Sequence, residues 1–195
     1  NYSDDYWFTQ YQDHNPATSS CWTNLKVYLT SKLAWNTSLN EDELIDKWFK
    51  AMYKDAAPIM KKLFMTQRAY QRSVLIDKFG LVSNGDGRVN VLLVEYWPIG
   101  LLEGWLDEID KAKAAVSRYQ ITNPTLYETI IKHIEVEAMS YMYIILETQG
   151  FTIASEKRME YINRIKQDLE WPDFAGMVIT SKQSVQAWVD GLPVA

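Results

Sequence analysis

The sequence predicts an all-α fold, an up-and-down array of about six helices with a short irregular or hairpin insertion near residues 81–96. Apolar side chains recur every three or four positions along most of the 195 residues, which is the spacing of a helix that buries one face. Capping residues or prolines stand where these periodic stretches begin. Short connections separate the stretches, and short connections favour antiparallel neighbouring helices.

The first two helices are predicted from the N-terminal third of the chain. Thr18, Ser19 or Ser20 can cap the first helix, because a side-chain oxygen there can accept a hydrogen bond from the first turn. The apolar positions of this helix are Trp22, Leu25, Leu29 and Leu33. Asn40 and Glu43 have the spacing of a capping box and predict the start of the second helix. Its apolar face holds Leu44, Ile45, Trp48, Phe49 and Met52.

A third helix and an irregular stretch follow. Pro58 predicts the helix start, because a proline in the first turn costs no hydrogen bond, and Gly80 is expected to end the helix. The turn-rich residues 83–87 and the alternating apolar residues after them predict a short hairpin or an extended loop. This turn resembles the middle of a calcium loop. The first and twelfth positions of that loop would be Val82 and Leu93, which offer no oxygen ligand, so a plain glycine turn is the preferred interpretation.

The C-terminal half is predicted to be helical as well. Pro98 resembles another helix start, and the pair at 123–124, Asn then Pro, predicts a long helix that ends at Gly150. Ser155 is expected to cap a shorter helix. Ser181 is expected to start a last short helix.

Composition excludes several classes of function. The formal net charge is −5, and no dense Lys/Arg cluster is present, which argues against a nucleic acid as partner. The single cysteine, Cys21, cannot form an internal disulfide or a cysteine metal site. No apolar run is long enough to predict a membrane span. No nucleotide-binding or nucleophile-elbow motif is present, and no cofactor is predicted.

The candidates for chemistry are acidic residues and one histidine on the predicted long helix. His133 and Glu137 are four positions apart and share a helix face, but further metal ligands are missing, so a surface ion pair is favoured over a metal site. Glu135 and Glu137 are interpreted as surface acids, because a glycosidase needs two carboxyls facing each other across the scissile bond. No catalytic residue and no metal ligand is assigned.

Aromatic residues are abundant, with eight Trp and twelve Tyr. The densest cluster is Tyr2, Tyr6, Trp7, Phe8, Tyr11 and Trp22. The preferred interpretation is a core edge or a docking surface for further sequence. The alternative is stacking on sugar rings, for which amphipathic rings with polar tips are suited.

Three stretches near the start resemble a known family. They are Tyr-Trp-Phe-Thr-Gln at 6–10, a helix at 25–36 that ends in Lys-Leu-Ala-Trp-Asn, and Leu-Ile-Asp-Lys-Trp-Phe at 44–49 leading to Tyr-Lys-Asp-Ala-Ala-Pro at 53–58. This order is similar to the end of the bacterial family called domain of unknown function 4838, DUF4838. That family resembles glycoside hydrolases of the α-glucuronidase and hexosaminidase kind. The resemblance covers residues 6–64.

The resemblance implies a (β/α)8 barrel upstream, with an active site at the C-terminal ends of its strands. Residues 1–17 would be a remnant of that domain, its last strand and loop, and residues 18–195 the helical domain. The strand would be 6–10, and residues 10–14 would face the substrate. Together with the aromatic cluster, this gives the ligand-binding candidates Tyr6, Trp7, Gln10, Tyr11, His14 and Trp22.

The function expected from the resemblance is a non-catalytic C-terminal helical domain that supports a carbohydrate-active barrel. Its partners would be the preceding barrel of the same parent chain and carbohydrate, in an exported, periplasmic or cell-surface bacterial protein. An apolar patch exposed around Trp7 and Trp22 is then expected. The alternative is a helical glycan- or protein-binding module that uses exposed Tyr and Trp. An independent enzyme is the third hypothesis.

Overall fold

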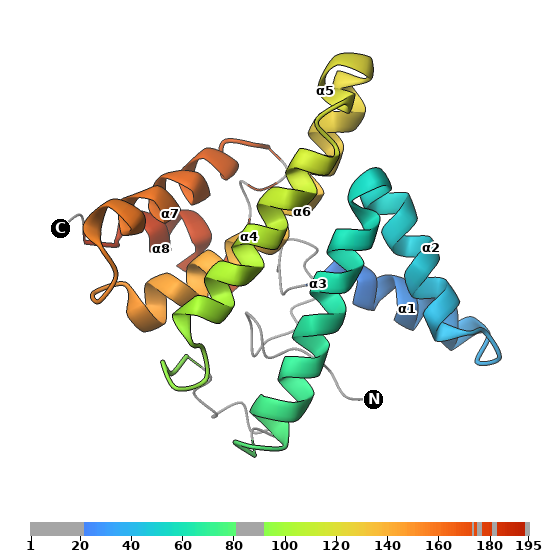
Figure 1. Ribbon diagram of the computed structural model, residues 1–195, viewed down its shortest axis with the longest axis horizontal. Coiled ribbons are helices and arrows are strands. Elements are labelled where there is room, and N and C mark those ends of the chain that lie inside the picture. The colour runs from blue at the N-terminus through green and yellow to red at the C-terminus, as the bar shows by residue number, and fades with distance from the viewer. Residues whose placement is uncertain (1–21, 81–91, 173, 175–176, 181–182, 194–195) are drawn as a thin grey trace.

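The computed structural model describes residues 22–80, 92–172, 174, 177–180 and 183–193, and this part of the chain is mostly helical (Figure 1). The predicted all-α class is confirmed. The longer helices are α1 (Thr23–Trp35), α2 (Glu41–Tyr53), α3 (Ala57–Tyr70), α4 (Ile99–Ala115), α6 (Pro124–Gln149) and α7 (Ser155–Asp168). The shorter elements are the 3₁₀ turn η2 (Lys54–Ala56), the π-helical η3 (Gln71–Ile76), α5 (Tyr119–Thr122), β1 (Val178–Thr180), β2 (Gln183–Ser184) and α8 (Val185–Asp190).

Two predicted caps are present as hydrogen bonds. Asn40 Oδ1 accepts a hydrogen bond from the backbone N–H of Glu43 at 3.1 Å, which starts α2. Asn123 Oδ1 accepts one from the N–H of Leu126, also at 3.1 Å, ahead of the proline that opens α6. Both caps satisfy N–H groups that have no partner inside the helix.

The third helix begins and ends as predicted. Pro58 lies in the first turn of α3, which continues without a break into η3. Gly80 follows with φ +66°, a left-handed conformation that favours glycine, and its N–H donates a hydrogen bond of 2.8 Å to the carbonyl of Ile76. The predicted insertion near 81–96 lies mostly outside the described residues, and residues 92–98 form a turn before α4.

Two predicted helix starts are wrong. Ala154, not Ser155, is the N-cap of α7, and Ser155 is already helical. The last helix starts later than Ser181, because β2 lies between that residue and α8 and pairs antiparallel with β1. Ser184 caps α8 instead, its Oγ accepting a hydrogen bond from the N–H of Ala187 at 3.0 Å. The first-helix caps predicted at 18–20 lie outside the described residues.

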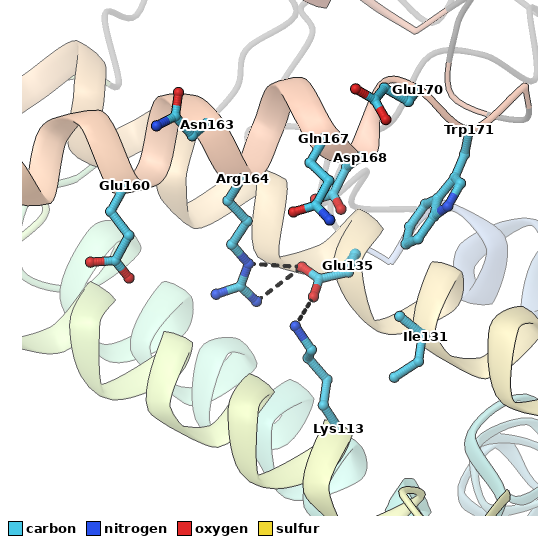
Figure 2. Close-up of a pocket in the computed structure, with 10 residues that line it drawn as sticks. All are labelled: Lys113, Ile131, Glu135, Glu160, Asn163, Arg164, Gln167, Asp168, Glu170 and Trp171. Carbon is cyan, nitrogen blue, oxygen red and sulfur yellow. Dashed lines mark hydrogen bonds and ion pairs between the residues drawn. The ribbon is translucent and has the colours of Figure 1, made fainter. Parts of the chain in front are cut away.

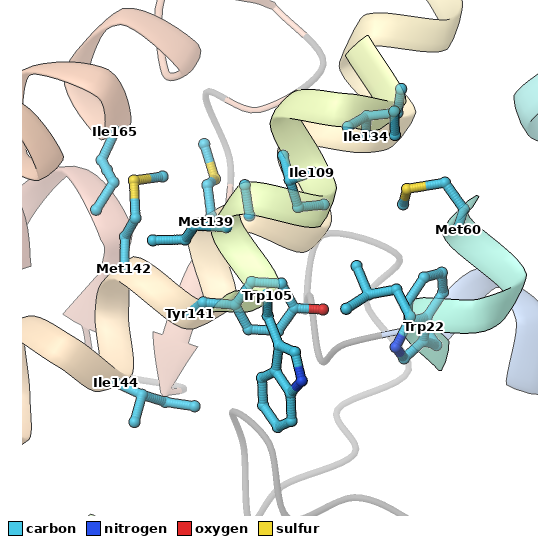
Figure 3. Close-up of a cluster of buried hydrophobic side chains, with 14 of the residues drawn as sticks. Trp22, Met60, Trp105, Ile109, Ile134, Met139, Tyr141, Met142, Ile144 and Ile165 are labelled. Carbon is cyan, nitrogen blue, oxygen red and sulfur yellow. The ribbon is translucent and has the colours of Figure 1, made fainter. Parts of the chain in front are cut away.

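The long helix α6 lies at the centre of the fold. It runs back along α4 after the short α5, with α2 and α3 on one side and α7 and α8 on the other (Figure 1). Side chains from α3, α4, α6 and α7 meet in one hydrophobic core (Figure 3). The buried α6 residues in that core are Ile130, Ile131, Ile134, Ala138, Met139, Tyr141, Met142, Ile144, Ile145 and Leu146. A helix that is apolar on several sides must be covered by several partners, which is the position α6 occupies.

Candidate functional site

Trp22 fixes the start of α1 in the core. Its side chain is 3% exposed, and its ring packs on Phe49 of α2 and Phe64 of α3 with centroid distances of 5.5 Å to each. Its backbone is left-handed, with φ 61°, which costs energy for a residue other than glycine. The contacts around the ring hold this conformation, so the direction in which α1 leaves Trp22 is fixed.

A buried polar network joins Trp22 to the central helix. The indole Nε1–H donates a hydrogen bond to Gln67 Oε1 at 2.6 Å, and the backbone N–H donates one to Glu137 Oε2 at 2.9 Å. The amide of Gln67 in turn donates to the hydroxyl of Tyr141. Buried polar groups that are paired in this way specify one arrangement of the helices around them.

The predicted ligand-binding residues divide into two groups. The structure describes only Trp22, which it places in the core, so the expected exposed patch is wrong at this residue: packing on the rings of α2 and α3 buries the indole. The other residues, whose role in binding stays a prediction, lie outside the described part of the chain: Tyr6, Trp7, Gln10, Tyr11 and His14.

A polar cleft of about 710 Å³ lies where α7 crosses α4 and α6 (Figure 2). Lys113 comes from α4, and Glu135 and Ile131 come from α6. From α7 and the residues after it, the cleft is lined by Glu160, Asn163, Arg164, Gln167, Asp168, Glu170 and Trp171. The cleft therefore combines acidic, basic and amide side chains with one indole ring.

Glu135 is the centre of the ionic cluster in this cleft. It is 2% exposed, and one oxygen, Oε1, accepts a hydrogen bond from Lys113 Nζ. The other, Oε2, accepts a hydrogen bond from Arg164 Nε at 3.0 Å and lies 2.9 Å from Arg164 Nη2. One buried carboxylate thus connects α4, α6 and α7. Its two cationic partners offset the cost of removing its charge from water.

Asp168 lines the same cleft. Burial raises the pKa of its carboxyl from 3.8 to about 7, and the negative charge of Glu135 adds to this effect, whereas the charges of Arg164 and Lys113 oppose it. Asp168 therefore changes its protonation near neutral pH. Perturbed acids gather at functional sites more often than elsewhere, which makes this cleft the candidate site of the described residues.

The prediction that Glu135 and Glu137 of the long helix are surface acids is wrong. Glu135 and Glu137 are both buried, because α6 is covered on several sides. Glu137 accepts the hydrogen bond from Trp22, and His133 Nδ1 lies 3.4 Å from the carbonyl oxygen of Met52. The predicted surface ion pair between His133 and Glu137 is therefore wrong. Burial also lowers the pKa of His133, although the contact with Met52 opposes this effect.

Sequence reasoning missed Lys113, Arg164 and Asp168 as site residues. They lie on two helices that meet only in the folded chain, and each also fits the polar face of an amphipathic helix. The available signal was the α6 pattern around Glu135, where apolar residues on all sides leave little room for an exposed carboxylate.

The described residues contain neither a metal-binding cluster nor a membrane-spanning helix. No three His, Cys, Asp or Glu side chains within them are grouped as a metal ion would need. Among the helices of the described part, none is both long and apolar enough to cross a membrane.

The first third of the chain is similar to a known protein family. No curated protein and no solved structure matches the chain. Residues 2–65 match a family described as a domain of unknown function, DUF4838. The matched residues include Trp22, α1, α2 and the first part of α3. The likeness to the DUF4838 family therefore extends over residues 2–65, in agreement with the resemblance expected over residues 6–64.

Proposed function

We propose that this chain is a non-catalytic helical region that supports a carbohydrate-active barrel domain in a longer, exported bacterial protein. In this proposal residues 1–17 are the last strand and loop of the barrel, and residues 18–195 are the helical domain. The carbohydrate-active part of the proposal comes from the family resemblance. The support role is inferred from the contacts and the exposure of the described residues.

The observation that carries the support role is a pair of large apolar side chains exposed on α1. Leu25 is the one buried residue of this helix, whereas Val27 and Trp35 are 59% and 92% exposed. Val27 and Trp35 are eight positions apart and lie on one face of the helix. Large apolar side chains that share an exposed face often mark a surface that another domain covers.

The anchoring of Trp22 supports the same role. Because its ring, its indole N–H and its backbone N–H are all held by the core, α1 has a fixed origin. A helix with a fixed origin and exposed apolar side chains can transmit the rigidity of the core to a neighbouring domain. Both features lie within the family-matched residues 2–65.

Residue-resolved hydroxyl-radical footprinting tests the proposal. The isolated chain and the longest natural protein that contains it are oxidised under the same conditions, and oxidation at Trp35 is quantified by mass spectrometry. We expect Trp35 to react readily in the isolated chain and to be protected at least fivefold in the longer protein.

Phe151 is the matched control, because it is 85% exposed and lies in the turn after α6, away from α1. Its oxidation should be the same in both proteins. Equal oxidation of Trp35 in the two proteins would overturn the support role. A Trp35→Ser variant of the longer protein should also unfold at a lower temperature than its parent, whereas the same change in the isolated chain should have little effect.

A further inference from the structure

The cleft between α4, α6 and α7 has properties that a purely supporting domain does not need. We propose that it binds a neutral, hydroxyl-rich ring compound, such as a terminal residue of a saccharide, against Trp171. This site is separate from the exposed face of α1, so it does not depend on the support role.

One buried hydrogen-bond acceptor in the cleft is unpaired. Asp168 is 4% exposed, yet its Oδ2 atom has no hydrogen-bond partner. Buried polar atoms are paired in the large majority of cases, and an unpaired one costs roughly 1–3 kcal/mol. Because Asp168 lines the cleft, a ligand that enters the cleft can supply the missing partner.

Arg164, on the same helix, has a buried Nη2 atom with two ion-pair partners but no hydrogen-bond acceptor. Arg164 Nη2 lies 2.9 Å from Glu135 Oε2 and 3.3 Å from Asp110 Oδ1, but it is in hydrogen-bonding geometry with neither. Asp168 is four positions further along α7, so the two side chains share a helix face. A hydroxyl group can both donate and accept, so a ligand with several hydroxyl groups suits an unpaired carboxyl oxygen and a guanidinium in the same cleft, whereas an ammonium group can only donate.

The net charge of the residues that line the cleft bears on the charge of its ligand. Two cationic side chains line the cleft, Lys113 and Arg164, and both already pair with Glu135. The acidic lining residues are Glu135, Glu160, Asp168 and Glu170. The lining is therefore acidic overall, which disfavours an anionic ligand such as a uronic acid or a phosphate.

One side of the cleft is formed by an aromatic side chain, Trp171. Trp171 is half-buried and lies at one end, with Ile131 beside it, while the amides of Asn163 and Gln167 line the α7 side (Figure 2). Lys132 Nζ lies 5.7 Å from the centroid of this ring and Phe174 packs against it at 5.3 Å, so the C–H face of a sugar ring would stack on the part of the ring that these two residues leave open. Amide and carboxyl groups can meanwhile bind the hydroxyl groups at its rim.

The test is a ligand-observed NMR titration of the whole chain with four probes: methyl glucoside, N-acetylglucosamine, glucosamine and glucuronate. We expect saturation transfer to at least one of the two neutral sugars with millimolar or tighter affinity. Affinity for glucuronate should be at least tenfold weaker. No binding of either neutral sugar, or tighter binding of glucuronate or glucosamine, would overturn the proposal.

Variants locate the site. Trp171→Ala and Gln167→Ala should each weaken binding of the neutral sugar about five- to tenfold, and Gln167 is exposed, so its truncation leaves the core intact. Trp35→Ala, which removes an exposed indole far from the cleft in sequence, should bind as the parent does. Unchanged affinity in both cleft variants, or loss of binding in Trp35→Ala, would place the sugar elsewhere and overturn the assignment.

Discussion

The backbone N–H of Trp22 donates a hydrogen bond of 2.9 Å to Glu137 Oε2, which joins the start of α1 to the middle of α6 across 115 positions of the sequence. The hydrogen bond is buried, and the indole of the same residue is paired with Gln67. Trp22 therefore connects three helices through its main chain and its side chain.

Replacing Trp22 should test this connection. Trp22→Phe removes the indole N–H, leaves Gln67 Oε1 buried without that donor, and leaves space beside Phe49. We expect a loss of about 2–3 kcal/mol in the free energy of unfolding. Urea unfolding followed by far-ultraviolet circular dichroism measures it. Trp35→Phe is the matched control and should change the stability by less than about 0.5 kcal/mol; equal effects of the two changes would contradict the anchoring role.

Neutralising Glu135 should destabilise the junction of α4, α6 and α7. Glu135→Gln keeps the shape of the side chain but leaves Lys113 and Arg164 without their shared counter-charge. We expect a loss of roughly 3 kcal/mol or more, because one partner of a buried ion pair is removed. The control is Glu43→Gln, which breaks a pair with Lys47 in which both side chains are exposed and should cost at most about 0.5 kcal/mol. Similar losses for both changes in chemical denaturation would refute the central role of Glu135.

Asp168 should make stability fall as the pH rises towards 8. Its pKa is raised from 3.8 to about 7 in the folded chain, so between these values the folded state binds more protons than the unfolded state. Its contribution is therefore complete below about pH 4 and is lost as the pH rises through 7. Burial is the main cause of the raised pKa; the charge of Glu135 of α6 adds to it, and those of Arg164 of α7 and Lys113 of α4 oppose it.

Asp168→Asn removes this titration. The variant should gain about 1–4 kcal/mol relative to the parent between pH 5 and pH 8.5. Melting temperatures of both proteins across that range give the difference. His133 acts in the opposite sense, because its lowered pKa makes the folded chain lose stability as the pH falls below 6.5, but its effect cancels between the two proteins. A pH-independent difference would show that Asp168 titrates normally.

Two glycines should respond in opposite directions to alanine. A Cβ on Gly104, within α4, meets no atom within 4 Å, so Gly104→Ala should stabilise the chain by about 0.5–1 kcal/mol through higher helix propensity. A Cβ on Gly150, at the end of α6, would come close to the carbonyl of Leu146, so Gly150→Ala should destabilise it by about 1–3 kcal/mol. Thermal unfolding of the two variants decides between this assignment and a uniform effect of glycine replacement.

The fold could be predicted where the determining interactions are local. Asn40 and Asn123 cap their helices through side chains that reach three residues along the chain, and this spacing is visible in the sequence. Ser184 was missed because β2 pairs with β1 before α8 begins, and strands of two or three residues leave almost no periodicity.

The candidate site could not be predicted, because long-range contacts create it. Lys113, Glu135 and Asp168 lie on three different helices, and their proximity depends on how α7 crosses α4 and α6. The unusual pKa of Asp168 depends on the burial that this crossing produces. In the sequence alone, each of these residues looks like an ordinary charged residue on a helix surface.

The last matched residue of the DUF4838 segment, Met65, lies in the middle of α3, and the helical rod continues through η3 to Ile76. Gln67, the partner of the Trp22 indole, lies two residues past that limit. A gene fragment cut at the family boundary would therefore encode an unfinished helix and an indole that has lost its acceptor. The portable unit for expression, swapping or design must extend beyond the family boundary, at least to the glycine that ends the rod.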